Sequence, residues 1–145
     1  CDELNDRLFE IQYLSNKCIF SNLTALYFHG YSNRIPLVYD VTVPRDYSGS
    51  LQHIDNVDLY YVDKEVLNLG VTTIIDEFGN ELKCYDLERS ICDIIKNKNK
   101  LDSELVNKAL RQYFFSVNKN PIKLFDYAKK LKVYKKMMEV FEVLS

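Results

Sequence analysis

The pattern of hydrophobic and polar positions along the chain changes near residue 86. Residues 36–44 and 57–62 alternate apolar and polar side chains, which is typical of strands with one buried face. Residues 70–76 and 81–86 lie on either side of the turn sequence EFGN, a combination that predicts a β-hairpin. After residue 86 the apolar residues recur at helical spacing, which predicts helices over 87–98, 102–116, 121–133 and 134–144.

Two further helices are predicted ahead of the first strand. Residues 2–14 carry a stripe of leucine and isoleucine on one face, with acidic residues in the first turn, where the helix dipole favours them. Residues 21–30 begin at Ser21, which is a good N-cap residue, and end at Gly30, which suits the left-handed position after a helix.

These elements together predict an α+β protein: a small antiparallel-rich mixed sheet with two N-terminal helices and a four-helix C-terminal half. The change of pattern divides the chain into a helix-helix-sheet part, residues 1–86, and a helical part, residues 87–145. We expect the two parts to pack as one compact unit. A chain of 145 residues, of which 47% are hydrophobic and 28% charged, has the makeup of a folded globular domain.

Composition also indicates the cellular location of the protein and the state of its cysteines. The apolar runs are far shorter than the roughly 18–20 residues that cross a bilayer, so we expect a cytoplasmic protein with no membrane segment. The four cysteines (Cys1, Cys18, Cys84 and Cys92) show no CxxC or Cys/His spacing, which predicts reduced core thiols and implies no metal or cofactor. Because the chain begins at Cys1 rather than Met and enters a predicted helix almost at once, we expect the natural chain to extend further toward the N-terminus.

The net charge of −2 is divided unevenly. Residues 1–95 hold 16 Asp or Glu against 7 Lys or Arg, a net charge of −9, whereas residues 96–145 hold 12 Lys or Arg against 5 Asp or Glu, a net charge of +7. Such asymmetry indicates a basic face for nucleic acid or for an acidic partner. The alternative is that the acidic and basic halves pack side by side and neutralise each other.

The segment from Lys119 to Lys136 concentrates this positive charge, with seven lysines and one acidic residue, Asp126. Lysines on the outer side of a helix suit contacts with phosphate groups, which give affinity without reading a base sequence. The segment has no arginine that would indicate recognition of base edges. The candidate nucleic-acid-binding residues are Lys123, Lys129, Lys130, Lys132, Lys135 and Lys136. An ordinary solvated helix face is the alternative.

The stretch YDLERSICDII, residues 85–95, gathers five ionisable groups and a thiol in a helix. Asp86 fits the N-cap and Glu88 the first turn, where both suit the helix dipole. Arg89 opposes that dipole, and with Asp93 it falls opposite the aliphatic face, on the side predicted to be exposed. We therefore predict that Arg89 is a tertiary clamp that holds a carboxylate outside its own helix.

One enzymatic pattern is present. Glu81 and Lys83 form an E-x-K sequence on a predicted strand, after Asp58, Asp63 and Asp76, and metal-dependent nucleases use such carboxylates with a lysine near the attacking water. Alternating charge on the solvent side of a hairpin is the simpler interpretation. Phosphate-binding glycine loops and nucleophile elbows are absent from the sequence, and we predict no catalytic residue.

Several stretches, taken in order, resemble the AbiEi family of antitoxins, the regulatory partners in type IV toxin–antitoxin pairs of bacterial abortive infection. They are SNLTALYFHGYSNRIP, YDVTVPRDY, YDLERSICDII, LDSELVNKALRQY and LFDYAKKLKV, and the resemblance runs from about residue 2 to residue 143. The positions that match the family signature are Ala25, Leu26, His29, Gly30, Val43, Pro44, Glu88, Arg89, Cys92 and Asp93. From its helical position, His29 fits the last turn of its helix, where a cation suits the dipole.

The resemblance implies a two-part protein. Family members carry an N-terminal winged helix-turn-helix that binds the promoter of their own operon. The C-terminal region counteracts a nucleotidyltransferase-like toxin and assists repression. This chain begins where the winged helix would end, so the partners implied are the toxin, without a required stable complex, and operator DNA or RNA. The alternatives are a metal-dependent nuclease using Glu81 and Lys83, and a protein-interaction module for an acidic partner.

Overall fold

The computed structural model describes residues 11, 18–31, 36–75 and 79–144. Over these residues the strands are β1 (Ile19–Phe20), β2 (Tyr39–Pro44), β3 (Val57–Val62), β4 (Val71–Ile75) and β5 (Glu81–Tyr85). The α-helices are α2 (Asn22–Phe28), α3 (Lys64–Leu67), α4 (Leu87–Lys96), α5 (Ser103–Phe114), α6 (Pro121–Lys130) and α7 (Tyr134–Leu144). Two short 3-10 turns are η1 (Ser50–His53) and η2 (Lys98–Lys100). The predicted α+β class is confirmed.

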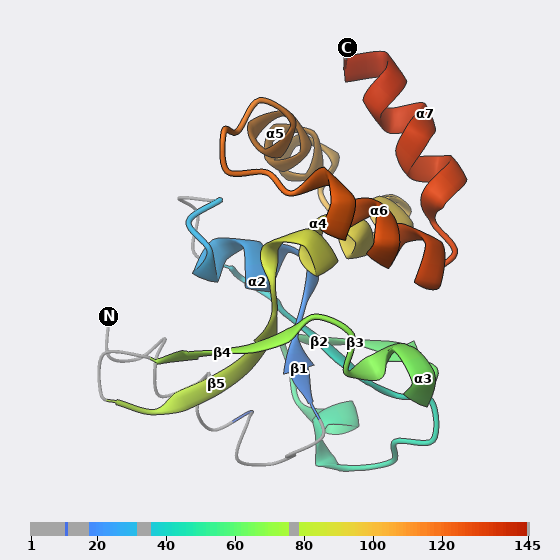
Figure 1. The fold of residues 1–145 in the computed structure, drawn as a ribbon. Helices are drawn as coiled ribbons and strands as arrows, with labels where there is room; N and C mark the ends of the chain where they lie inside the picture. Colours follow the sequence, from blue (N-terminus) through green and yellow to red (C-terminus); the bar gives the residue numbers. More distant parts are fainter. Residues whose placement is uncertain (1–10, 12–17, 32–35, 76–78, 145) are drawn as a thin grey trace.

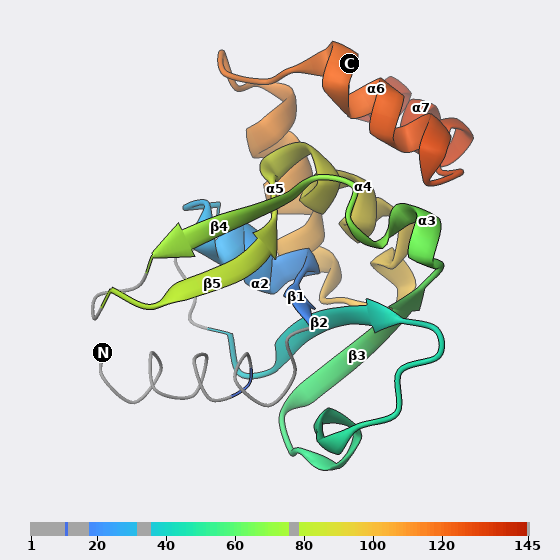
Figure 2. The same cartoon turned by 60° about the horizontal axis from the view of Figure 1, so that its bottom comes forward.

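The five strands form one sheet in the order β3-β2-β1-β5-β4. The pairs β1–β2 and β4–β5 are antiparallel, whereas β1–β5 and β2–β3 are parallel. The sheet is therefore mixed, as predicted, but its pairings are evenly divided rather than mostly antiparallel. Figure 2 shows the β4–β5 hairpin and the β2–β3 pair extending to opposite sides of β1, a two-residue strand that the sequence pattern did not predict.

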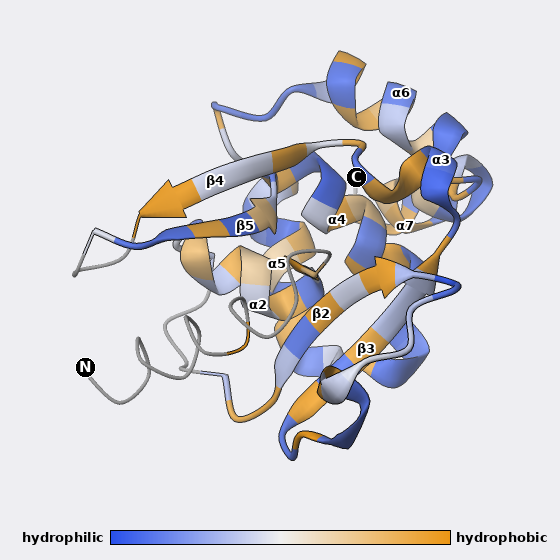
Figure 3. Cartoon of the chain, turned by 90° about the horizontal axis from the view of Figure 1, so that it is seen from below, coloured by the Kyte–Doolittle hydropathy of each residue, from blue (hydrophilic) through white to orange (hydrophobic). Residues whose placement is uncertain are grey.

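The alternation seen in the sequence is retained along β2 and β3, where hydrophobic and hydrophilic residues follow one another (Figure 3). In β3 it has the expected result, since exposed and covered positions alternate along most of the strand. In β2 every residue is buried. The polar side of β2 is covered by the start of α2, where Thr24 Oγ1 accepts from the backbone amide of Asp40 and Ser21 Oγ accepts from Thr42 Oγ1.

Most of the predicted helix starts are confirmed, whereas α4, α5 and α6 end at Lys96, Phe114 and Lys130, two or three residues before the predicted ends at 98, 116 and 133. Asp86 and Asp102 cap α4 and α5 with their carboxylates, and Pro121 is the first residue of α6. Gly30 follows α2 with φ +80°, the left-handed conformation that closes a helix. Ser21 occupies the N-cap position of α2 but its hydroxyl bonds to Thr42 instead.

The predicted first helix, residues 2–14, lies outside the described residues except for Ile11, which is helical and buried. None of the helices in the described part of the chain is both long enough and apolar enough to span a membrane.

The helix α2 lies between two hydrophobic clusters. Its Leu26 packs with residues of α4, α5, α6 and α7, and its Ala25 packs with the sheet residues around Phe20, Val41 and Cys84. Figure 1 shows the same arrangement, with the strands on one side, α2 and α4 in the middle, and α5 and α7 beyond them. Both predicted parts of the chain thus contribute to the cluster that contains Leu26, because α2 comes from the first part and α4 from the second.

Gly70 is the glycine at which a side chain is least tolerable. It has φ +81°, and a Cβ there would lie 2.8 Å from Arg89 Cβ. We expect Gly70→Ala to lower the free energy of unfolding by about 2–4 kcal/mol, because a strained backbone and an overpacked contact add together. Urea unfolding measures the change. Gly79→Ala is the matched control, since Gly79 has φ +83° and a Cβ there meets nothing within 4 Å. Equal losses in both variants would contradict the packing argument.

Candidate functional site

Arg89 is the centre of a buried junction between α4 and the segment before β4. Its Nη1 donates to the carbonyl oxygens of Val66 at 2.6 Å and Leu69 at 2.7 Å, and its Nε donates to Asp93 Oδ1 at 3.1 Å. Its Cζ lies 4.0 Å from the ring centroid of Tyr85. The planar guanidinium therefore bonds α4 to the end of α3 while stacking on the last residue of β5. Arg89 thus holds α4 to two other parts of the fold.

The predicted partner and exposure of Arg89 were wrong. Its carboxylate partner is Asp93 of the same helix, and the partners outside the helix are carbonyl groups. Arg89 is 0% and Asp93 5% exposed, whereas both were predicted to face solvent. The reason is that Tyr85 and the α3–β4 connection cover the polar side of α4. Burial raises the pKa of the Asp93 carboxyl, and the Arg89 guanidinium opposes that rise.

The start of α4 is also joined to α6. Asp86 Oδ1 accepts from the amide of Arg89, and Asp86 Oδ2 accepts from the Tyr127 hydroxyl and lies 3.0 Å from Lys123 Nζ. Lys123 Nζ also lies 3.8 Å from Glu88 Oε1. The hydrogen bond to Asp86 raises the pKa of Lys123. Lys123 was predicted to face nucleic acid; the structure places it in an intramolecular ion pair at the α4–α6 junction.

Glu88 has a larger role than that of a first-turn charge. It is buried and accepts a hydrogen bond from the Tyr113 hydroxyl of α5 at 3.0 Å. Burial, with the carboxylate of Glu88 adding to it, raises the pKa of Tyr113. The same Tyr113 oxygen accepts from the backbone amide of Asn120, the N-cap of α6. Glu88 thus connects α4 to α5 and, through Tyr113, to the start of α6.

Of the other signature positions, His29 meets the same junction, Gly30 and Pro44 end an element, and Ala25, Leu26, Val43 and Cys92 lie in the hydrophobic clusters. His29 Nε2 lies 2.8 Å from the carbonyl oxygen of Tyr85, and because a carbonyl only accepts, this nitrogen carries the hydrogen. His29 therefore joins α2 to the end of β5, a tertiary bond that its helical position did not reveal. Gly30 closes α2, and Pro44 is the last residue of β2. The signature residues thus hold elements together.

The remaining candidate lysines form an exposed group around the α6–α7 connection, which we call the lysine surface: Lys129, Lys130, Lys132, Lys135 and the partly exposed Lys136. Lys130 pairs with Asp126 at 3.1 Å, with both side chains more than half exposed, so the pair is weak. Lys129 Nζ lies 5.3 Å from the ring centroid of Tyr134. Lys132 has φ +62° where the chain turns from α6 into α7. The turn brings these five cations onto one short stretch of surface.

A buried polar cluster at the start of α2 was not predicted. The Asp40 carboxylate accepts from the backbone amides of Leu23 and Thr24 and from the Tyr60 hydroxyl. In the register of the parallel strands Asp40 lies opposite Asp58. Burial, and then repulsion from Asp58, raises the pKa of Asp40 from 3.8 to about 7, while the hydrogen bonds oppose the rise. The sequence does show polar residues inside strand 39–44. An alternating pattern, however, predicts that such residues face solvent, so the buried cluster was missed.

The backbone beside this cluster adopts an unusual conformation. Asn22 is buried with φ +52°, in the left-handed region, and its Oδ1 accepts from Asn97 Nδ2 at 3.1 Å. Its own Nδ2 donates to Ser21 Oγ. Asparagine tolerates this conformation better than most residues, so the amide both permits the turn into α2 and ties it to the end of α4.

The residues of the E-x-K pattern are not assembled with the predicted aspartates. Glu81 and Lys83 are exposed on β5, whereas Asp58 lies on β3, with β2 and β1 between the two strands. Asp63 pairs with Arg45, and Asp76 lies outside the described residues. Over the ranges that the structure describes, no group of three or more His, Cys, Asp or Glu could hold a metal ion.

Three cysteines lie in the core as predicted. Cys18, Cys84 and Cys92 are buried, and Cys1 lies outside the described residues. Burial raises the pKa of Cys84 to about 12 and raises the pKa of Cys92 as well. Both groups therefore stay in the thiol form at neutral pH, which makes them poor nucleophiles.

The buried clamp can be tested against an exposed pair of the same spacing. We expect Arg89→Met to lower the free energy of unfolding by about 3–5 kcal/mol, because it leaves Asp93 buried without its cation. Lys130→Met breaks the exposed Lys130–Asp126 pair, which has the same i,i+4 spacing, and should cost at most about 1 kcal/mol. Chemical denaturation compares the two. Similar small losses in both variants would show that Arg89 is not the clamp described.

Asp40 should make stability depend on pH. Because its pKa in the fold is about 7, above the 3.8 of the free group, the folded state binds a proton that the unfolded state has lost. The contribution is complete below about pH 4 and is lost as pH rises through about 7. We expect wild type to lose about 2–4 kcal/mol relative to Asp40→Asn over this range. Unfolding series from pH 4 to 8 measure this, with Asp126→Asn as the exposed control; parallel curves for wild type and Asp40→Asn would refute it.

Comparison of the sequence with models of protein families and with curated proteins finds no match. The likeness to AbiEi antitoxins therefore rests on the quoted sequence stretches alone. The fold adds one observation about the signature positions. His29, which follows α2, and Glu88, Arg89 and Asp93 of α4 belong to one set of contacts around the β5–α4 connection.

Proposed function

We propose that this chain is the antitoxin-bearing region of an AbiEi-type regulator, cytoplasmic and non-catalytic, and that it contacts nucleic acid through the lysine surface. The observation that carries the proposal is the lysine surface itself: five cations at the end of α6, in the connection and at the start of α7, with Asp126 as an acidic partner of one of them. Ammonium groups on flexible stems suit phosphates at many positions along a strand.

The role of the signature residues supports the proposal. Arg89, Asp93 and Glu88 are buried and occupied by bonds within the protein, and His29 is held by a backbone carbonyl. These residues behave as a framework that fixes how α4, α5 and α6 are placed. Because these buried residues are used for the framework, the binding residues of such a protein are expected on the outer surface of the helices.

The charge distribution gives the mechanism. A nucleic acid is repelled by residues 1–95, with a net charge of −9, and attracted to residues 96–145, with a net charge of +7. This gradient directs a phosphate backbone to the helical half of the molecule. Phosphate contacts release counterions, so binding is sensitive to salt and tolerant of sequence. The bound strand is either operator DNA beside a winged helix or an RNA that the toxin also seeks.

The test is a triple neutralisation. We expect Lys129→Gln, Lys132→Gln and Lys135→Gln together to weaken binding to duplex DNA and to single-stranded RNA, and to reduce the slope of log K against log salt concentration by up to about 3. Fluorescence anisotropy titrations at several salt concentrations measure both. The matched control carries Lys96→Gln, Lys98→Gln and Lys100→Gln, the same charge change around η2, and should bind nearly as wild type.

Three results would contradict the proposal. Binding that is unchanged in the α6–α7 triple variant would remove the lysine surface from the mechanism. Salt-sensitive co-purification with the toxin in nuclease-treated extracts, without nucleic-acid binding, would favour a module for an acidic protein. Magnesium-dependent cleavage that disappears with Glu81→Gln would favour the nuclease.

A further inference from the structure

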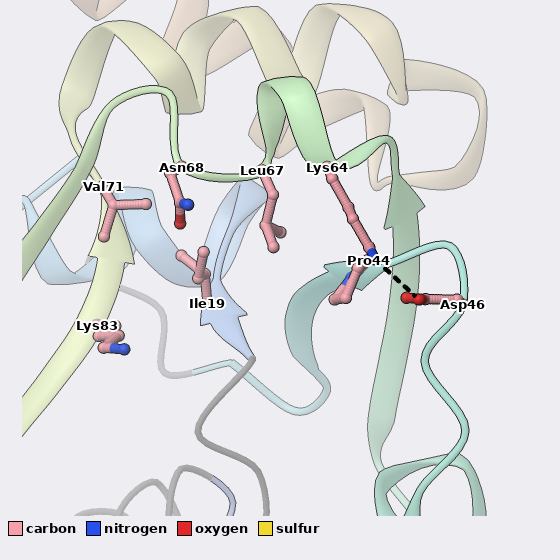
Figure 4. Close-up of a pocket in the computed structure, with 8 residues that line it drawn as sticks. All are labelled: Ile19, Pro44, Asp46, Lys64, Leu67, Asn68, Val71 and Lys83. Carbon is pink, nitrogen blue, oxygen red and sulfur yellow. Dashed lines mark ion pairs between the residues drawn. The ribbon is translucent and has the colours of Figure 1, made fainter.

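A cavity of about 440 Å³ lies between α3, the end of β2 and the strands β1 and β5, away from the residues of the lysine surface. It is lined by Ile19, Pro44, Asp46, Lys64, Leu67, Asn68, Val71 and Lys83. In Figure 4, Leu67 at the end of α3 and Asn68 after it extend toward Ile19. Lys83 lies beside β5 at one end of the lining, and the Lys64–Asp46 pair lies at the other end. Cavities of this size commonly bind small molecules.

The walls of the cavity are aliphatic and its edge is polar. Four aliphatic side chains come from four different parts of the fold: Ile19 from β1, Pro44 from β2, Leu67 from α3 and Val71 from β4. The described lining residues include no aromatic ring on which a base or another flat group would stack. The body of a fitting ligand is therefore aliphatic, and its polar group meets Lys64, Lys83 or Asn68.

The charge at this cavity opposes that of the surrounding half of the chain. Residues 1–95 carry a net charge of −9 and contain three lysines, Lys17, Lys64 and Lys83. Lys17 lies outside the described residues, and the other two both line this cavity. Lys64 Nζ lies 3.2 Å from Asp46 Oδ2, and both side chains are largely exposed. Because Asp46 also lines the cavity, it offsets the charge of Lys64, and the positive charge of the lining is centred on Lys83 at the other end.

The roof of the cavity is held in place by the buried junction. The Tyr85 hydroxyl donates to the carbonyl of Leu67 at 2.6 Å, and Arg89 Nη1 donates to the carbonyls of Val66 and Leu69. These bonds fix the segment that supplies Leu67, Asn68 and Val71 to the lining. A cavity with a fixed roof is formed before a ligand arrives, which lowers the cost of binding.

We propose that this cavity binds a small organic anion with an aliphatic body, whose carboxylate or phosphate head is held by Lys83. The proposal goes beyond nucleic-acid binding and does not involve the lysine surface. It also gives the E-x-K sequence a different role, because Lys83 then serves as a ligand contact rather than as part of a nuclease site.

The experiment is a titration followed by ¹H–¹⁵N NMR of the whole chain. The probes are octanoate and octyl phosphate, which share the body and differ in the head, n-octanol as the uncharged form, and AMP as an anion with a flat aromatic body. We expect saturable shifts at Ile19, Leu67, Val71 and Lys83 with octanoate or octyl phosphate. Octanol and AMP should bind at least about tenfold more weakly, since one lacks the head and the other the aliphatic body.

Variants separate the cavity from general charge. Lys83→Gln should weaken binding of the better probe by about tenfold. Lys64→Gln, at the other end of the cavity and paired with Asp46, should change binding little. Lys96→Gln, an exposed lysine on α4, is the control of equal charge and should leave binding unchanged. The proposal is overturned by absence of saturable shifts, by octanol binding as tightly as octanoate, by AMP binding best, or by Lys83→Gln and Lys96→Gln behaving alike. None of these outcomes depends on nucleic-acid binding.

Discussion

Arg89 has no contact with water, yet a guanidinium stays charged at any pH a protein tolerates. The surrounding structure supplies a negative charge and acceptors for Nε and Nη1 in place of water, while Nη2 is buried without an acceptor among the described residues. Asp93 supplies the charge from one turn further along α4, and the carbonyls of Val66 and Leu69 supply acceptors. Gly70 has no side chain, which allows its backbone to lie close to Arg89. The path of the chain from α3 into β4 follows from these requirements.

That same junction determines where the functional surfaces lie. On one side it fixes Leu67, Asn68 and Val71 over the cavity beside Lys83. On the other side Asp86 and Glu88 hold Lys123, which sets the position of α6 on α4. The turn that follows α6 carries the lysine surface. Arg89 therefore helps, through α4, to position both the aliphatic cavity and the proposed nucleic-acid surface, although Arg89 belongs to neither.

Local patterns predicted what is local. Alternation predicted strands at 36–44 and 57–62, and the structure has them at 39–44 and 57–62. The helix starts at Asp86 and at positions 102 and 121 were also predicted, because capping and helical spacing depend on neighbours in sequence. A helical projection shows the apolar side of α4 but not what covers its other side, so it placed Arg89 and Asp93 in solvent. The same limit hid Asp40 and the bond from His29 to Tyr85. Each depends on a partner from another element. The parallel β2–β3 pairing likewise depends on the long connection through η1, which carries no pairing signal.

The unequal division of charge has two possible explanations, packing of the acidic half on the basic half or a surface that serves a partner. Lys123 does reach across, to Asp86 and Glu88. Other ion pairs stay within one half: Arg45 with Asp63, Lys64 with Asp46, Arg89 with Asp93 and Lys130 with Asp126. Lys129, Lys132 and Lys135 remain exposed at the α6–α7 turn. The halves meet in the apolar cluster around Leu26 and Ile91 and through hydrogen bonds such as Tyr113 to Glu88 and Tyr127 to Asp86. Hydrophobic packing therefore joins the halves, and much of their opposite charge is left facing solvent, where it can act on a partner.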